Sequence, residues 1–334
     1  MLTIRKLRSF LCRIVVCRIA LGVASSLQLT VAVGATNYYE WTFDDGNLLP
    51  SIGSGMLAFA DFTTANVTTF GTTGGGVPHI GGQPASFMHV PVLNAIGNGY
   101  FLTMSQTSSN GGGAYINQYT LIMDVLLPGS INWTALFNTD PFNGNDADWY
   151  VAPDASLGIF DLGYTPAGVI APNTWYRIAF AADLGAGAVT YYINGAPAYQ
   201  LTGGGGLLDG RFALYSTNDA LPSFLLFNEG DSSGNYTHEL YVAGIAAVDC
   251  ALTPSEVAGL AGPNAEGIFT RRLHIARHGT NAVVAWNAAS TLRLQRATTL
   301  SPPDWVNAPG TLGASNFMES TFNFQMRSYR LIWQ

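Results

Sequence analysis

Apolar and polar residues alternate most regularly between Asn173 and Tyr199. Over residues 175–182 every second position belongs to one apolar set, made up of Tyr176, Ile178, Phe180 and Ala182. A period of two predicts a strand with one buried face. Residues 183–187 are rich in turn formers, and the alternation then resumes over 189–193. It ends at Asn194-Gly195, which tolerates the positive φ of a tight turn, so the segment predicts a β-hairpin.

Short strands of the same kind are predicted along most of the chain, separated by Gly, Pro, Asn and Ser. The predicted strands span residues 39–43, 87–92, 118–127, 135–137, 157–162, 175–182, 189–193, 211–216, 224–227 and 239–248. One helix is predicted after Thr253, which can act as its N-cap. Pro254 suits the first helical position, and Glu256 completes a capping box.

The first 35 residues have the features of a secretory signal peptide. They combine a basic start, an apolar run over 19–33 and small residues at 33–35. A membrane anchor is the alternative, but the run is short and is interrupted by Ser25, Ser26 and Gln28. We expect export and cleavage, and therefore a secreted, extracellular or periplasmic protein. Cleavage would remove Cys12 and Cys17 and leave Cys250 as the one remaining cysteine, which excludes an intramolecular disulfide.

Charge is divided unevenly along the chain. Residues 36–268 contain two arginines against nineteen acids, a net charge of −17, whereas residues 269–334 contain seven arginines against two acids, a net charge of +5. The acidic part is unsuited to nucleic acid or to an anionic membrane. It is compatible with Ca²⁺ or with neutral sugars.

The Trp-opened strand, the Asp-Gly turn and the Tyr-Ile-Asn-Gly strand of 175–195 resemble the core of LamG-like jelly rolls, in the concanavalin A-like lectin/glucanase superfamily. Residues 41–46 resemble the opening strand of that family and 248–257 its closing signature. The resemblance covers residues 39–262 and implies an all-β fold, a two-sheet antiparallel jelly-roll sandwich. The sequence departs from many relatives at 242–245, where an acidic pair is missing, so any role of that pair is absent or has moved to Glu239.

Residues 269–334 form a second predicted domain, a small arginine-rich β module. Strands are predicted over 282–286, 292–296 and 329–333. The segment resembles small immunoglobulin- or fibronectin-like modules at the ends of secreted bacterial proteins. The organisation is thus a signal peptide at 1–35, a LamG-like domain at 36–268 and this module at 269–334.

No catalytic residue is predicted. Glycanases need two positioned carboxylates, and the nearest match, Glu229-Gly230-Asp231, lacks the third acid of the laminarinase-type strand. The strand motifs of related alginate lyases are also missing. The glycine runs at 74–76, 111–113 and 203–206 are predicted to be loops, because a phosphate cradle needs a following helix and usually a lysine.

A calcium site is one interpretation of residues 138–148, which concentrate oxygen ligands in a Gly-containing loop. By the LamG resemblance, Asp148 opens a strand and is the best ligand candidate, with Asp146 beside it and Asp219 from a second loop. A solvated Asn/Asp turn cluster is the alternative.

Aromatic residues near loops are the candidates for stacking on sugar rings: Trp149, Tyr164, Tyr215 and Trp133. The alternative is that a Trp at an alternating position belongs to the core, and Trp41 and Trp175 are predicted to do so. We expect a non-catalytic recognition protein for extracellular carbohydrate or cell-envelope components. The alternatives are a free-standing relative of the LamG-like domain fused to secreted metallophosphoesterases, an adhesion protein, and a divergent glycanase or lyase.

Overall fold

The structure is a computed structural model. It describes residues 37–93, 95, 97–105, 108–139, 148–159, 162–202, 208–214, 223–228, 237–269, 274–278, 281–285, 292–298, 304–314, 316–320 and 328–333. The chain divides after Ile268 into two compact units. Among these residues, no helix has the length and apolar character of a membrane span.

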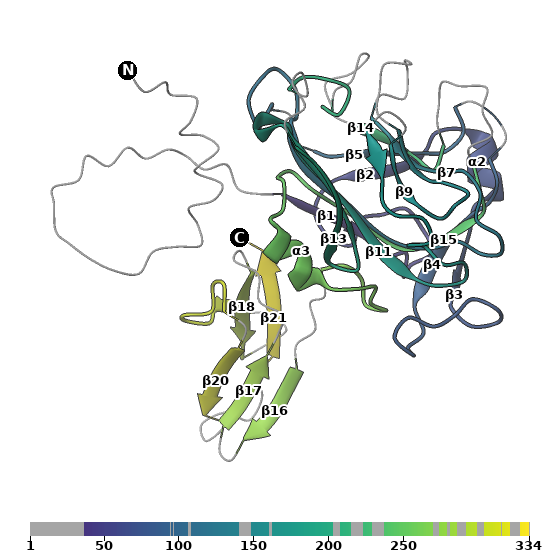
Figure 1. The fold of residues 1–334 in the computed structure, drawn as a ribbon. Helices are drawn as coiled ribbons and strands as arrows, with labels where there is room; N and C mark the ends of the chain where they lie inside the picture. Colours follow the sequence, from purple (N-terminus) through teal and green to yellow (C-terminus); the bar gives the residue numbers. More distant parts are fainter. Residues whose placement is uncertain are drawn as a thin grey trace, which may run out of the picture. The chain divides into compact units, whose positions relative to one another are not determined.

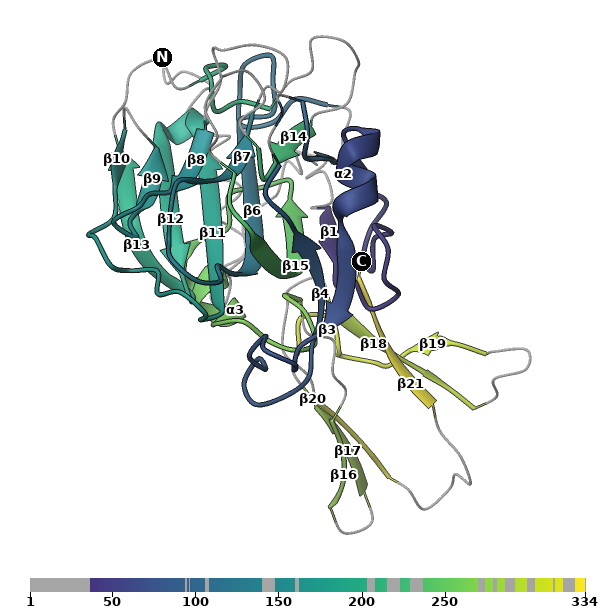
Figure 2. The ribbon, with the colours of Figure 1, turned by 90° about the vertical axis from the view of Figure 1, so that its right-hand side faces the viewer.

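The larger unit is a sandwich of two antiparallel sheets (Figure 1). The first sheet has the order β13-β12-β11-β6-β15-β4-β3, with β1 also paired to β15; Figure 2 shows β12, β11, β6 and β15 side by side. Its strands are β1 (Tyr38–Trp41), β3 (Thr69–Thr72), β4 (Ser86–Val90), β6 (Gln118–Leu126), β11 (Tyr176–Asp183), β12 (Ala188–Ile193), β13 (Ala196–Thr202) and β15 (Leu240–Val248).

The second sheet has the order β10-β9-β8-β7-β14-β5-β2. Its strands are β2 (Met56–Phe59), β5 (Tyr100–Thr103), β7 (Thr134–Asn138), β8 (Asp148–Val151), β9 (Leu157–Ile159), β10 (Gly163–Tyr164) and β14 (Ser223–Leu226). The described residues of this unit also form two short helices, α2 (Phe62–Val67) and α3 (Pro254–Leu260), and a 3-10 turn, η2 (Leu184–Ala186). The prediction of an all-β, two-sheet antiparallel sandwich is confirmed.

The described residues of the smaller unit form two three-stranded sheets. One has the order β16-β17-β20, made up of β16 (His274–His278), β17 (Asn281–Ala285) and β20 (Asn316–Ser320). The other has the order β19-β18-β21, made up of β18 (Leu292–Ala297), β19 (Val306–Asn307) and β21 (Ser328–Trp333).

Aromatic side chains fill the space between the two large sheets. Phe180 lies at the centre, with its ring centroid 4.9 Å from that of Phe137 and 5.5 Å from that of Trp149. All three side chains are fully buried, as is Trp41. Trp175 is buried in a separate cluster, where its indole nitrogen donates to the carbonyl of Pro78 at 2.8 Å. The predicted burial of both tryptophans is confirmed.

The turn and the helix that the sequence predicts are present. Asn194 and Gly195 have φ of 50° and 82° and connect β12 to β13 in two residues. Thr253 caps α3 through a capping box with Glu256. Both features are local, because each depends on residues within four positions of one another.

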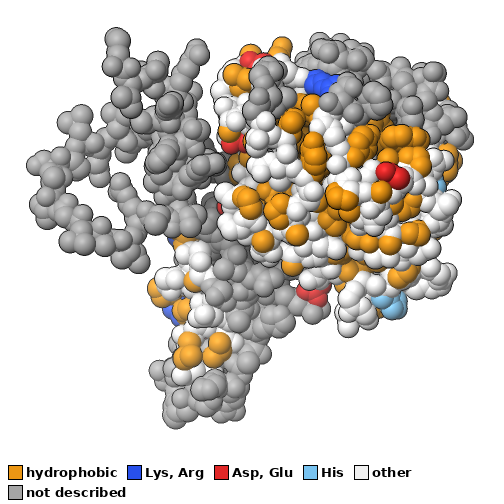
Figure 3. All heavy atoms as spheres, viewed as in Figure 1, with side chains coloured by type: hydrophobic (Ala, Val, Ile, Leu, Met, Phe, Trp, Pro, Cys, Tyr) orange, Lys and Arg blue, Asp and Glu red, His pale blue; other side chains and the backbone are white. Residues whose placement is uncertain are grey.

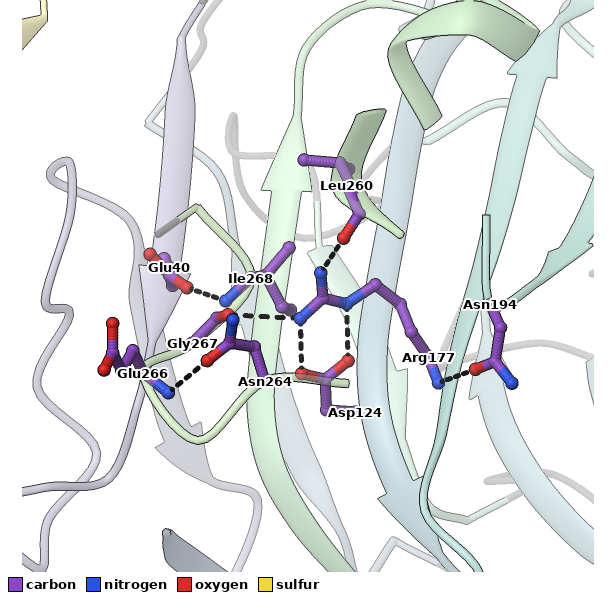
Figure 4. Close-up of polar contacts among 9 residues, drawn as sticks. All are labelled: Glu40, Asp124, Arg177, Asn194, Leu260, Asn264, Glu266, Gly267 and Ile268. Atoms are coloured by element: carbon purple, nitrogen blue, oxygen red, sulfur yellow. Dashed lines mark hydrogen bonds and ion pairs between the residues drawn. The ribbon is translucent and has the colours of Figure 1, made fainter. Parts of the chain in front are cut away.

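A buried ion pair lies on the face of the first sheet that points away from the core. Arg177 on β11 and Asp124 on β6 are cross-strand partners, and both side chains are almost completely buried. The guanidinium donates two hydrogen bonds of 2.7 Å to the carboxylate (Figure 4). Such a bidentate pair is stronger and more directional than a single contact.

The ion pair anchors residues 249–268, which we call the strap. Arg177 also donates to the carbonyls of Leu260 at 2.5 Å and Gly267 at 3.1 Å. At the end of the strap, Glu40 on β1 accepts a 2.5 Å hydrogen bond from the amide of Ile268. The strap therefore covers the outer face of the first sheet around Arg177, where its backbone supplies the acceptors that the buried arginine needs.

Replacing Asp124 by Ala should lower the free energy of unfolding by about 3–5 kcal/mol, because the Arg177 charge stays buried without its partner. Denaturant unfolding of the full chain measures this. Asp45→Ala, at an exposed acid, is the control and should change stability by less than about 0.5 kcal/mol. The double replacement Asp124→Leu with Arg177→Met should recover most of the loss. A loss below about 1 kcal/mol for Asp124→Ala would contradict this role of the ion pair.

Candidate functional site

The orientation of strand β8 decides which of its aromatic residues can meet a ligand. Trp149 is fully buried between the sheets, 5.6 Å from the ring of Phe137 and 5.8 Å from that of Tyr191. The prediction that Trp149 stacks on a sugar is therefore wrong, because core side chains cover its ring. Since side chains alternate along a strand, the next residue, Tyr150, lies on the outer face of the second sheet.

Three aromatic side chains gather on that outer face, and we call them the aromatic platform: Trp133, Tyr150 and Tyr164. The ring of Trp133 lies 6.0 Å from that of Tyr150 and 6.4 Å from that of Tyr164, with interplanar angles of 87° and 71°. Edge-to-face contacts of this kind stabilise aromatic pairs. Trp133 and Tyr164 are half-buried, and Tyr150 is 7% exposed. The structure thus brings together two of the residues that the sequence predicts.

The register of four strands builds the platform. Tyr150 pairs with Ala135 on β7 and with Gly158 on β9, and Gly158 pairs with Tyr164 on β10. These positions form one row across the sheet. A Cβ atom at Gly158 would lie 2.6 Å from the Tyr164 ring and 2.4 Å from the carbonyl of Gly163. Glycine is therefore needed for the Tyr164 ring to lie against β9.

A bulge in β7 sets this register. The pairing with β8 shifts between Ala135 and Phe137, so that one extra residue lies on β7. Leu136 and Phe137 both reach the core, while Ala135 remains opposite Tyr150. Ala135 follows Trp133 by two residues and has a small side chain. Because of the bulge, the platform and the core lie on opposite faces of the sheet.

Polar groups lie in the segments that adjoin the platform. Asn132 is exposed, and its side chain accepts a 2.9 Å hydrogen bond from the amide of Trp133. Asp154 is exposed in the turn between β8 and β9. Hydrogen bonds from the Ser156 hydroxyl at 2.6 Å and from its amide at 3.0 Å lower the pKa of Asp154, so this carboxylate is ionised at neutral pH.

The proposed calcium ligands fall mostly outside the described residues. Asp146 and Asp219 lie there, as does Tyr215; Asp148 is the first residue of β8 and pairs with Asn138. Within the described ranges, no group of three or more His, Cys, Asp or Glu residues could hold a metal ion. Glu229 and Asp231, the nearest match to a glycanase motif, also lie outside these ranges.

Glu239 contacts a histidine on the outer face of the first sheet. Its Oε1 accepts a 2.8 Å hydrogen bond from Nε2 of His89, whose ring stacks on Tyr241 at 4.9 Å. The Nδ1 atom of His89 lies 3.3 Å from the hydroxyl of Thr69. These contacts connect β3 and β4 to the start of β15, so Glu239 helps to hold these strands together.

The glycine run at 111–113 forms a cradle that is filled by a carboxylate of the same chain. The three glycines have φ of 67°, 95° and 72°. Asp209 accepts hydrogen bonds from the amides of Ala114 and Tyr115 and from the side chain of Asn117, at 2.8–3.0 Å. The backbone donors that could bind an external anion are thus used to fix this loop.

No protein-family profile matches the chain, and no curated protein matches it. Among solved structures, it is similar to domain 4 of AbnA, a GH43 extracellular arabinanase from Geobacillus stearothermophilus in complex with arabinotriose. That match has 18% identity and a TM-score of 0.43, and covers 68% of this chain and 100% of the other. A second is the binding domain of botulinum neurotoxin serotype D, with 10% identity, a TM-score of 0.43 and coverage of 74% and 60%.

A third similar structure is the CBM40 of the Ruminococcus gnavus IT-sialidase bound to alpha2,3 sialyllactose. It has 15% identity and a TM-score of 0.35, and the match covers 44% of this chain and 83% of the other. Likenesses this distant assign neither a family nor a ligand to the chain. The LamG-like resemblance of the sequence therefore stays a prediction.

Acid should weaken the Asp209 cradle. Partial burial opposes ionisation of Asp209, but the hydrogen bonds from Asn117, Ala114 and Tyr115 outweigh it and lower its pKa. A group with a lowered folded-state pKa stabilises the protein above its unfolded pKa, about 3.9, and loses this effect as the pH falls through the folded value. Wild type should thus exceed Asp209→Asn in unfolding free energy at pH 6, and the difference should shrink below about pH 4.

Asn is the matched replacement because it tolerates the φ of 56° at this position. The measurement is denaturant unfolding of both proteins from pH 2 to pH 7. A difference in stability that does not change with pH would show that the charge of Asp209 plays no part in fixing the loop.

Proposed function

We propose that the larger unit binds neutral carbohydrate, with the aromatic platform as the surface on which sugar rings stack. The observation that carries this proposal is the grouping of Trp133, Tyr150 and Tyr164 on the outer face of the second sheet. Pyranose rings have apolar faces that pack on aromatic rings, while the amide and carboxylate groups of Asn132 and Asp154 suit sugar hydroxyls.

Charge supports a neutral ligand over an anionic one. Residues 36–268 contain only two cationic side chains, Arg177 and Arg211. Arg177 is 2% exposed and bound to Asp124, and Arg211 lies 5.5 Å from the ring of Phe212. Figure 3 shows that apolar and neutral polar side chains predominate on one face of this unit, with few charges. An anionic polymer would meet mainly acids here and be repelled.

Trp133→Ala should weaken binding to the polysaccharide that wild type recognises by tenfold or more, because a central aromatic anchor commonly contributes over 1.4 kcal/mol. Affinity electrophoresis with soluble glucans, xylan, mannan, galactan and arabinan identifies the ligand and gives the affinity. Phe62→Ala removes an aromatic side chain that is 80% exposed on α2 and is the control. If Trp133→Ala and wild type were equally retarded and had equal melting temperatures, the aromatic platform would not be the binding surface.

We further propose that Ca²⁺ binds at the Asp146/Asp148 loop, with Asp219 as an additional ligand. The support is the concentration of oxygen ligands in residues 138–148 of the sequence. This loop leads directly into β8, which carries Tyr150. An ion bound there would fix the start of the strand on which the platform depends.

Calcium should raise the melting temperature of wild type relative to EDTA. A ligand that binds only the folded state stabilises it by about 2.7 kcal/mol at a hundred times its dissociation constant. The difference should disappear in Asp148→Ala and persist in Asp45→Ala. Identical melting of wild type in millimolar Ca²⁺ and in EDTA would exclude the site.

A further inference from the structure

The rings of the aromatic platform do not lie in one plane. The ring of Trp133 makes an interplanar angle of 87° with that of Tyr150 and of 71° with that of Tyr164. Tyr150 is only 7% exposed, so little of its ring can contact a ligand. The rings that a ligand can reach are therefore those of Trp133 and Tyr164, which are both half-buried. Because these two rings meet at 71°, a flat surface can lie against one of them but not against both.

Packing fixes the angle between the two rings. A Cβ atom at Gly158 would lie 2.6 Å from the ring of Tyr164, so that ring occupies space that only a glycine on β9 leaves. Trp133 is oriented by its edge-to-face contacts with both tyrosines. Turning either ring until the two were coplanar would break such a contact. The rings of Trp133 and Tyr164 thus form the two walls of a corner, and we call them the corner.

Asn132 and Asp154 can supply hydrogen bonds beside the corner. The pairing of Thr134 with Val151 brings Asn132 and the turn that follows β8 to the same end of the second sheet. The side-chain oxygen of Asn132 accepts from the amide of Trp133, so its amino group remains as a donor. One oxygen of Asp154 accepts both hydrogen bonds from Ser156, and the other oxygen of this exposed carboxylate remains as an acceptor. A donor and an acceptor of this kind suit the hydroxyl groups along the edge of a sugar ring.

We propose that the corner binds one sugar residue of a single glycan chain, with the face of the sugar on one wall and its edge on the other, and that the platform does not bind the flat surface of a crystalline polysaccharide. This inference rests on the proposed binding of neutral carbohydrate and specifies the form of the ligand. Sugars in a flat layer can stack on several aromatic rings at once only if those rings are coplanar. A single chain can turn within the corner, and it leaves the edges of its sugars open to Asn132 and Asp154.

Two binding assays of the full chain test the proposal. The first is affinity electrophoresis in the soluble glucans, xylan, mannan, galactan and arabinan, and the second is pull-down on microcrystalline cellulose, chitin and crystalline mannan. Wild type should be retarded by at least one soluble polymer. Short oligosaccharides of the same sugar should abolish that retardation, because one sugar residue and its neighbours make all the contacts. Retention of wild type on the crystalline polymers should not exceed that of Trp133→Ala.

The two walls of the corner are tested with variants that fold as wild type does, as judged by equal melting temperatures. Trp133→Ala and Tyr164→Ala should each weaken binding of the same trisaccharide about tenfold, because one sugar residue contacts both rings. Tyr164→Phe keeps the ring and should keep most of the affinity. Phe62→Ala, on α2, is the control and should bind as wild type does.

The outcomes separate this inference from the proposed function. Retention on a crystalline polymer that depends on Trp133, and that soluble oligosaccharides do not reverse, would overturn the inference and leave carbohydrate binding in place. A loss of affinity in Trp133→Ala without any loss in Tyr164→Ala would also overturn it, because the sugar would then contact only one wall. Absence of binding to every soluble and crystalline probe would overturn the proposed function itself, and the inference with it.

Discussion

The ion pair between Arg177 and Asp124 is the interaction on which the outer side of the first sheet depends. A charge withdrawn from water needs nearly all of its hydrogen bonds to be made inside the protein. The sheet supplies the carboxylate of Asp124, and the strap supplies the carbonyls of Leu260 and Gly267. If the strap left the sheet, the arginine would lose these two acceptors. The cross-strand pair therefore helps to hold helix α3 and the segment after it against the sheet.

Both arginines of the larger unit have contacts within the protein. Arg177 is used inside the structure, and Arg211 packs against an aromatic ring. No arginine in this unit is therefore left over for an anionic ligand. In the smaller unit arginines outnumber acids. Arg296 forms an ion pair with Glu319, and Arg293 is half-buried. The two units therefore carry net charges of opposite sign.

Local patterns predicted the local structure well. The strand around Phe180, the turn at Asn194-Gly195 and the capping box at Thr253 each depend on near neighbours, and the structure contains all three. The prediction that only one face of this strand is buried is wrong, because residues 177–182 are buried on both faces. Strands β2, β3 and β5, with four residues each, were not predicted, and neither was the longer β13. Strands β1 and β14 are as short as β2 and were predicted. The strand predicted at 211–216 is wrong: the described residues there form a turn and a single bridge to Ile116.

The candidate site was predicted only in part, for a physical reason. Sequence placed Trp133 and Tyr164 near loops, but the alternation of β8 permits either Trp149 or Tyr150 to face outward. That choice depends on the bulge in β7 and on pairing between strands from different parts of the chain. Tyr150 was therefore missed, although a glycine at 158 beside an aromatic strand is a signal of close packing that could have indicated the platform.

The platform also lies on the least extensively paired edge of the sandwich. Strands β8, β9 and β10 have four, three and two residues, and β10 is the outermost. Just before β10, the carbonyl of Leu162 accepts a 2.6 Å hydrogen bond from the hydroxyl of Tyr199 on β13, which connects this edge to the first sheet. Short ladders open locally at low free energy, so the amide hydrogens of β10 should exchange with solvent well before those of β6 or β11. A ligand that spans these strands would have to suppress this local opening, which lowers the net free energy of binding. The affinity would therefore depend on the local stability of this edge as well as on contacts with the aromatic rings.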